Sequence, residues 1–220
     1  MSRRQRCAPA GWVYHVMNRA AGNQVLFRDP VDFANFQRLL TQAQERQKMR
    51  IIAYCLMGNH WHLLLWPDTD DAIGPFMHWL CTEHGKHWRR SDGSVGRGAV
   101  YQGRYRISVI QFGQHLFTVW RYIERNPLRA GLVDQAEKWP WSSLSESFTG
   151  DRPRLSPAPL AKPQDWLDIV NKPQTLAELQ GVRDTLAEDR PFGDKVWTDM
   201  TERLTGWKAR GRPKKVPDSF

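Results

Sequence analysis

Two apolar, strand-like segments separated by a two-residue turn signal limit the possible folds of this chain most strongly. The first, MRIIAYCLM (49–57), is rich in apolar and β-branched residues, and the second, HWHLLLWP (60–67), ends at Pro67. Gly58-Asn59 between them is a turn signal of the kind that joins antiparallel strands. The simplest prediction is a β-hairpin, so the fold must contain an antiparallel sheet.

Strand and helix signals alternate on both sides of this hairpin. WVYHVMNRA alternates as a strand does, and the helix that follows has Asp29 as a candidate N-cap and Pro30 at its first position. After the hairpin, the pattern predicts a helix, a flexible Gly- and Ser-rich loop, a strand and a further helix, over 71–90, 91–100, 101–110 and 111–126. The first ~145 residues therefore predict an α+β fold, β-α-β-β-α-β-α, in which helices cover a small antiparallel sheet.

The composition changes near residue 149, which predicts a division of the chain into a main domain and an extension. The main domain covers 1–148, and the stretch TGDRPRLSPAPLAKPQDW at 149–166 is Pro-rich and predicts a linker. Two helical patterns then predict a small C-terminal helical module over 167–207. The basic tail at 208–220 is predicted to be disordered, although its KARGRPKK resembles an AT-hook core.

The charge of the chain indicates what kind of partner it binds. Lys and Arg total 32 against 23 Asp and Glu, a formal net charge of +9, and the excess lies mainly before residue 150. A basic domain attracts phosphate backbones or anionic membranes, and no basic amphipathic helix is obvious, which favours nucleic acid. Some of the 11 tryptophans suit stacking on unpaired bases, although most are expected in the core.

Membrane and disulfide chemistry are not expected. No apolar run approaches the ~20 residues that span a bilayer, and the N-terminal residues lack the apolar region of a secretion signal, so we expect no membrane partner and a cytoplasmic location. The three cysteines, Cys7, Cys55 and Cys81, are widely spaced and odd in number. They indicate neither a disulfide framework nor a paired-cysteine metal site.

The first residues of the second strand of the hairpin carry the clearest chemical signal. Residues i and i+2 of a strand point to the same face, so His60 and His62 project side by side with Leu64. Trp61 and Leu63 then face the other way, into a core. Two imidazoles at this spacing can bind one divalent cation, but a pair of histidines without a metal gives the same pattern, so the spacing alone leaves both interpretations open.

A candidate nucleophile lies on the helix predicted around 116–125. Tyr122 and Asn126 stand one turn apart beside the apolar stripe of this helix, so they are expected to overhang the sheet. A tyrosine attacks a phosphodiester when a metal polarises the phosphoryl oxygen, and the amide oxygen of Asn126 would be a third ligand. The alternatives are an ordinary tyrosine of an amphipathic helix and an asparagine that caps the turn beginning at Pro127.

Together these motifs resemble those of a known group of DNA-processing enzymes. GNHWHLLL (58–65) resembles the His-hydrophobic-His motif of HUH single-strand endonucleases, and RYIERNPLRAGLV (121–133) resembles the tyrosine helix of the REP-associated tyrosine transposases. GWVYHVMNRA (11–20) and YQGRY (101–105) also fit that family. The resemblance covers roughly residues 8–145 in the family's order, and the combination is more specific than any one motif.

The resemblance implies a ferredoxin-like fold for residues 1–148 and cleavage of single-stranded DNA through a 5′-phosphotyrosine intermediate that releases a free 3′-OH. By position, His60 and His62 match the metal-binding pair and Tyr122 the nucleophile. Asn126 matches the third polar ligand, where relatives in mobile elements often have glutamine. The family's substrates are short palindromes that form imperfect hairpins, so the expected activity is the cleavage and rejoining of single-stranded hairpin DNA.

The expected cofactor is Mg²⁺ or Mn²⁺, because cellular availability and phosphate oxygens offset the preference of imidazoles for softer ions. Zinc fits less well, since no third strong nitrogen or sulfur ligand is evident in the sequence. Arginines near the expected site are candidate DNA contacts, and each is equally compatible with a solvated or salt-bridged role on the surface; they are Arg19, Arg104, Arg106 and Arg129.

Two other functions compete with a tyrosine transposase. A hairpin-binding regulator that has lost cleavage would have the same fold, and a metal-dependent nuclease that uses water would leave Tyr122 with a structural role. A covalent adduct between the protein and DNA separates the transposase from both. The sequence is equally compatible with a monomer and a homodimer.

Overall fold

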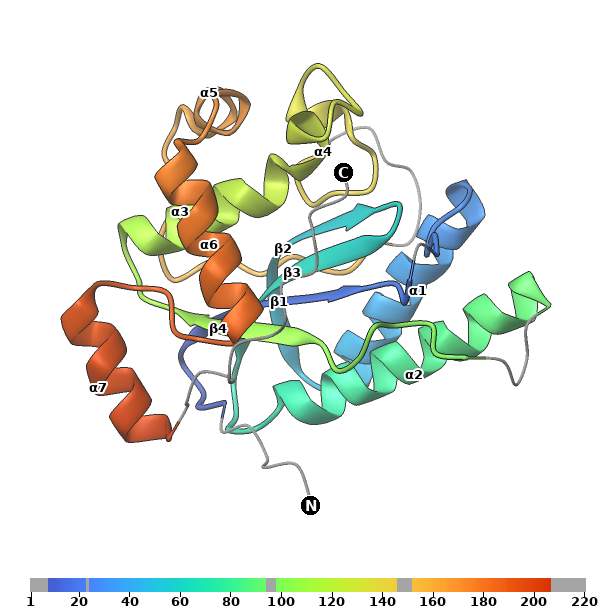
Figure 1. Ribbon diagram of the computed structural model, residues 1–220, viewed down its shortest axis with the longest axis horizontal. Coiled ribbons are helices and arrows are strands. Elements are labelled where there is room, and N and C mark those ends of the chain that lie inside the picture. Colours follow the sequence, from blue (N-terminus) through green and yellow to red (C-terminus); the bar gives the residue numbers. More distant parts are fainter. Residues whose placement is uncertain (1–7, 23, 94–97, 146–151, 207–220) are drawn as a thin grey trace.

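The computed structural model describes residues 8–22, 24–93, 98–145 and 152–206, and its centre is a four-stranded sheet (Figure 1). The strands lie in the order β2-β3-β1-β4, and each neighbouring pair is antiparallel. Two helices connect β1 to β2 and β3 to β4, which confirms the expected ferredoxin-like α+β fold. The bounds are β1 (Val13–Arg19), α1 (Pro30–Arg46), β2 (Met49–Met57), β3 (His60–Pro67), α2 (Ile73–Asp92) and β4 (Arg106–Ile110).

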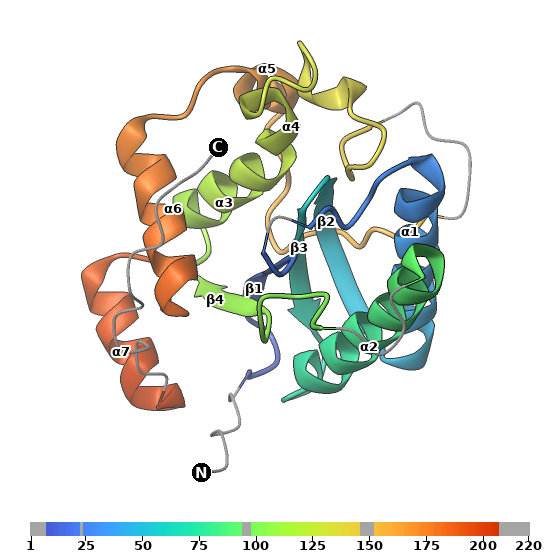
Figure 2. The same ribbon diagram turned by 45° about the vertical axis from the view of Figure 1, so that its right-hand side comes forward.

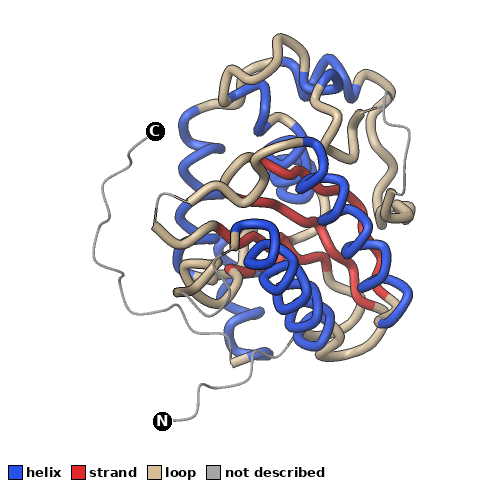
Figure 3. Tube along the Cα trace, turned by 90° about the vertical axis from the view of Figure 1, so that its right-hand side faces the viewer, coloured by secondary structure: helices blue, strands red, loops and turns tan. Residues whose placement is uncertain are grey.

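Helices α1 and α2 cover the same face of the sheet, as Figures 2 and 3 show. The Asp29 carboxylate caps α1 by accepting hydrogen bonds from the backbone N–H groups of Val31 and Asp32. Gly93 caps the C-terminus of α2, and its φ of 66° is a left-handed conformation that glycine adopts without strain. Large side chains fill the space between these helices and the sheet, among them Tyr14, Phe36, Trp61 and Phe76.

The opposite face of the sheet is covered by the second half of the chain (Figure 2). Helix α3 (Gln114–Glu124) contacts β2 and β3, and α4 (Asn126–Arg129) follows it, because the residue before Pro127 is disfavoured in a continuous helix. Helix α5 (Trp166–Asn171) packs against α3, and α6 (Leu176–Glu188) packs against both α3 and β4. The remaining elements are the 3-10 helix η1 (Ala136–Lys138) and α7 (Lys195–Thr205).

A buried carboxylate on α3 binds side chains from later segments of the chain. Glu124 is fully buried, and its two oxygens accept hydrogen bonds from the indole N–H groups of Trp120 (2.9 Å) and Trp166 (2.6 Å). Ser143 Oγ (3.2 Å) and Lys162 Nζ (3.1 Å) donate to the same carboxylate. Because a buried charge is stable only when its partners satisfy it, this network fixes the Pro-rich segment and α5 against α3.

Both outer strands of the sheet have backbone partners from later in the chain. Beside β4, the backbone of Phe192 donates to the carbonyl of Val109 and accepts from the N–H of Gln111. Beside β2, the N–H of Ser156 donates to the carbonyl of Ile51. Segments that follow α3 in the sequence therefore extend the hydrogen bonding of the sheet at its two edges.

The division of the chain at residue 149 stays a prediction. The described part of the predicted linker, 152–166, contacts β2 and α3, and helices α6 and α7 form within the predicted helical module. The basic tail at 208–220 lies outside the described residues. Among the helices that the structure does describe, none combines the length and apolar character needed to cross a bilayer.

Candidate active site

The alternation of side chains along β1 and β3 places three histidines on the face covered by α3. Trp61 belongs to the core under α1 and α2, while Leu64 belongs to the core under α3. His60 and His62 share the face of Leu64, and the centres of their two rings are 5.1 Å apart. On the neighbouring strand, His15 lies on the same face and is buried. The geometry thus brings the predicted histidine pair together and adds a third imidazole.

Tyr122 projects from α3 toward these imidazoles within the same chain. Its ring centre is 5.6 Å from that of His62, with the ring planes at 89°, and 6.0 Å from that of His15. Tyr122 is one of the buried residues of α3 because the apolar stripe of this helix packs on β2 and β3. The helix therefore holds the Tyr122 phenol beside the histidine pair, which agrees with the predicted position of Tyr122 over the sheet.

His15 is the site residue that we did not predict. Its Nε2 lies 2.9 Å from Nδ1 of His62, which is hydrogen-bonding distance, and its ring centre is 5.0 Å from that of His62. A signal was present in the sequence, because the alternation in WVYHV places His15 on the face opposite Tyr14 and Val16. The pairing of β1 with β3, which brings it to His62, is not visible in any local pattern.

Burial keeps the three imidazoles neutral near pH 7. It lowers the pKa of His15 to about 3 and, together with the positive charges of Arg19 and Arg129, lowers the pKa of His60 to about 3. The pKa of His62 is lowered well below its usual range, first by burial and then by the neighbouring histidines and arginines. A neutral imidazole keeps a lone pair, so these side chains are in the protonation state that a metal ligand requires.

Asn126 and Arg129 close the site from α4. Arg129 Nη2 donates to Asn126 Oδ1 at 2.7 Å, and the guanidinium carbon of Arg129 lies 4.4 Å from the centre of the Tyr122 ring. Among the described residues, neither Asn126 Nδ2 nor Arg129 Nη1 has a hydrogen-bond partner, although both atoms are buried. Buried polar atoms without partners are costly, so these two donors suit a site that binds an anionic ligand.

These residues fit a divalent cation that also takes ligands from its substrate. Within the described part of the chain, no group of three or more His, Cys, Asp or Glu side chains is arranged to hold a metal. His60 and His62 offer two neutral nitrogens, and Asn126 Oδ1 keeps one lone pair besides the one used by Arg129. Such a set leaves room for phosphate oxygens and water, which is how Mg²⁺ is usually bound in phosphate-processing sites.

Arg19 and Arg106 lie on the same face of the sheet as the histidines but in different surroundings. Arg19 is exposed and stands opposite His60 in the register of β1 and β3. Arg106 is engaged with the end of α6, since its Nη1 donates to the carbonyl of Ala187 at 2.9 Å and lies 3.9 Å from the carboxylate of Asp189. Arg19 is therefore better placed than Arg106 to contact a substrate.

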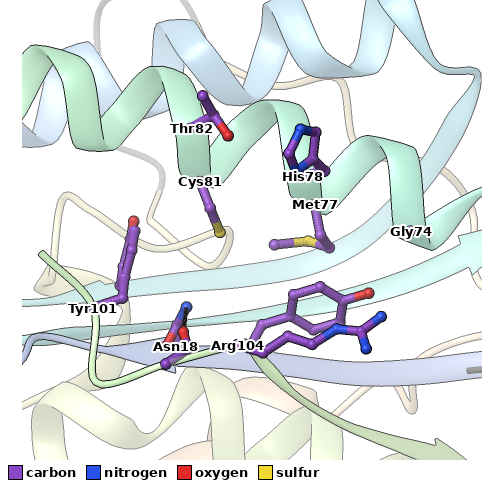
Figure 4. Close-up of a pocket in the computed structure, with 10 residues that line it drawn as sticks. Asn18, Gly74, Met77, His78, Cys81, Thr82, Tyr101 and Arg104 are labelled. Atoms are coloured by element: carbon purple, nitrogen blue, oxygen red, sulfur yellow. Dashed lines mark hydrogen bonds between the residues drawn. The ribbon is translucent and has the colours of Figure 1, made fainter. Parts of the chain in front are cut away.

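Arg104 lies away from the histidines. It lines a separate cavity of about 470 Å³ between α2, the end of β1 and the segment before β4 (Figure 4). This cavity is on the α2 side of the sheet, whereas Tyr122 belongs to the core on the other side. Asn18 and His78 line the same cavity, and the guanidinium carbon of Arg104 is 5.7 Å from the ring centre of Tyr105. The segment that carries Arg104 passes over the α2 side before it enters β4, which the sequence pattern did not indicate.

The sheet order and the placement of the site define a ferredoxin-like α+β domain with a polar site on one face of its sheet. The sequence model of the family described as "Transposase IS200 like" matches residues 10–126, just over half of the chain. The protein belongs to this family, and the match confirms that its resemblance to DNA transposases is a family relationship.

One relative and two solved structures are similar to parts of this chain. A Haemophilus influenzae protein, provisionally named a REP-associated tyrosine transposase, is 23% identical over 144 residues, which are 61% of this chain and 77% of the relative. A solved structure of a REP-associated tyrosine transposase bound to a REP hairpin has the same fold, with a TM-score of 0.54 at 17% identity over 65% of this chain and 82% of that one. A provisionally assigned transposase of Deinococcus radiodurans R1 matches 60% of this chain and 95% of its own at 15% identity and a TM-score of 0.39.

Proposed function

We propose that this protein cleaves and rejoins single-stranded hairpin DNA, with Tyr122 as nucleophile and a divalent metal bound by His60 and His62. The observation that carries this proposal is the position of the Tyr122 ring, 5.6 Å from the His62 ring in the same chain. Membership of a transposase family supports a DNA substrate. The solved relative bound to a REP hairpin supports hairpin DNA as the class of substrate.

Each residue has a distinct part in the proposed chemistry. His60, His62 and Asn126 would hold Mg²⁺ or Mn²⁺, and the bound ion would supply Lewis-acid polarisation of the scissile phosphoryl group and stabilisation of the leaving oxygen. The Tyr122 oxygen attacks phosphorus and gives its proton to solvent, while the P–O3′ bond breaks and the 3′ oxygen takes up a proton. Arg129 Nη1 has no partner among the described residues, so it can donate to a phosphate oxygen. Rejoining is the reverse reaction, in which a 3′-OH attacks the phosphotyrosine.

The test is the detection of a covalent adduct between protein and DNA. Labelled single strands from the producing genome, each able to fold into a hairpin, are incubated with the protein and Mn²⁺ and run on a denaturing gel. We expect a slow band with the wild type and none with Tyr122→Phe, which should still bind the DNA. Tyr105→Phe is the matched control, because Tyr105 lines the cavity on the opposite face of the sheet.

The same gel separates the competing functions. Binding without cleavage, for both strand polarities and with both Mg²⁺ and Mn²⁺, would support a hairpin-binding regulator. Cleavage without an adduct, at the same rate in Tyr122→Phe, would support a nuclease that uses water. Either result would overturn Tyr122 as the nucleophile.

A further inference from the structure

The imidazole of His60 has one nitrogen fixed by its neighbour in the turn. His60 Nδ1 lies 2.7 Å from Asn59 Oδ1. A carbonyl oxygen only accepts hydrogen bonds, so Nδ1 of His60 carries the hydrogen and its lone pair is on Nε2. The turn itself is held in place, since the N–H of Ala20 donates to the carbonyl of Asn59 and the N–H of Leu26 donates to that of Gly58.

His62 has an equivalent contact on the same ring nitrogen. Its Nδ1 lies 2.9 Å from Nε2 of His15, so one of these two nitrogens donates and the other accepts. If His15 donates, the lone pair of His62 is used within the pair and its Nε2 carries a hydrogen, which excludes a cation there. If His62 donates, its Nε2 is free in the same way as that of His60.

We propose that Asn59 and His15 are positioning residues, which keep a hydrogen on Nδ1 of His60 and of His62 so that both Nε2 lone pairs are available to one cation. This inference rests on the proposed metal-dependent function and adds two residues to it. Hydrogen-bond partners of metal-bound histidines fix both the tautomer and the ring orientation, and their loss typically weakens metal binding by about 10–100-fold. His15 suits this role because it is buried in a central strand.

The test measures Mn²⁺ binding to the DNA-free protein by the electron paramagnetic resonance signal of free Mn²⁺. We expect His15→Leu and Asn59→Leu to raise the dissociation constant by about 10–100-fold. His15→Gln and Asn59→Asp, which keep an accepting oxygen, should recover most of the affinity. The control is His84→Leu, since His84 is also buried and hydrogen-bonded, to Tyr101, but lies on the α2 side. Thermal unfolding of each variant shows whether it is folded.

The outcomes separate this inference from the function on which it rests. A wild type that binds no Mn²⁺ and forms no adduct would overturn the proposed function. A wild type that binds Mn²⁺, with His15→Leu and Asn59→Leu binding equally well, would overturn the inference alone. Nitrogen-15 chemical shifts of the metal-free wild type give a second measurement, in which a hydrogen on Nε2 of His62 would also overturn it.

Discussion

Glu124→Gln should destabilise the protein more than the removal of an exposed charged side chain does, because the Glu124 carboxylate accepts hydrogen bonds from two buried indole N–H groups. Glutamine has a similar volume but only one accepting oxygen, so it leaves one of Trp120 and Trp166 without its partner. A hydrogen bond to a charged group contributes ~1.5–3 kcal/mol, and an unpaired buried donor costs ~1–3 kcal/mol. We expect a loss of about 3 kcal/mol, equivalent to about 6–12 °C in Tm for a chain of this size.

Urea unfolding followed by tryptophan fluorescence measures this loss, and Lys86→Met is its control. Lys86 pairs with Glu83 on α2 and its side chain is 55% exposed, so this ion pair is screened by solvent and its removal should cost less than ~1 kcal/mol. Amide hydrogen exchange should increase more in α5, which carries Trp166, than in α1 on the other face. A loss for Glu124→Gln no larger than that for Lys86→Met would refute this account of the network.

Three further predictions concern pH and the arginines. Burial lowers the pKa of His15 and His84 to about 3 from 6.5, so unfolding takes up protons below pH 6.5. The free energy of unfolding should therefore fall as the pH drops from 6.5 toward 3, by up to ~1.4 kcal/mol per pH unit for each group, and equal urea midpoints at pH 7 and pH 5 would contradict this. Arg19→Ala should reduce the slope of log affinity for DNA against log salt concentration by ~0.7, because one phosphate contact is lost. Arg104→Ala should leave both this slope and adduct formation unchanged. A reduced slope for Arg104→Ala and an unchanged one for Arg19→Ala would place the substrate on the α2 face. Arg129→Lys should slow adduct formation by about tenfold or more, because lysine cannot bond Asn126 and a phosphate oxygen in the same planar geometry, and an unchanged rate would exclude this role.

Local sequence patterns predicted the α+β class, the order of the strands and helices, and the face of the sheet that carries the candidate site, whereas the ferredoxin-like topology was implied by the family resemblance. Strand alternation separated His60 and His62 from Trp61, and helical spacing placed Tyr122 at the edge of the stripe on α3. These predictions depend only on the period of one element, which is fixed by its backbone geometry. The order of the elements then left few ways to build the sheet.

Features that depend on contacts between distant segments were not predicted. His15 and His62 are 47 positions apart, and only the pairing of β1 with β3 brings them together. The positions of Arg104 and Arg106 depend on the path before β4 and on the packing of α6, neither of which has a local signal. The predicted linker gave no sign that its Lys162 meets Glu124, because Pro-rich composition reports local stiffness rather than tertiary contacts.

The occupied edges of the sheet bear on how this protein associates with itself. Exposed edge strands are templates on which another chain can add a strand, and this is a common route to aggregation and strand-exchanged dimers. Here Ser156 already hydrogen-bonds to β2 and Phe192 to β4. A second copy of the protein would have to displace these segments of the first copy before it could add a strand to the sheet. A chain that ends at residue 151 lacks both of these contacts, but Trp141 and Ser143 still hydrogen-bond to the other end of β2. Truncation should therefore release the β4 edge, and the shortened protein should self-associate more than the intact chain.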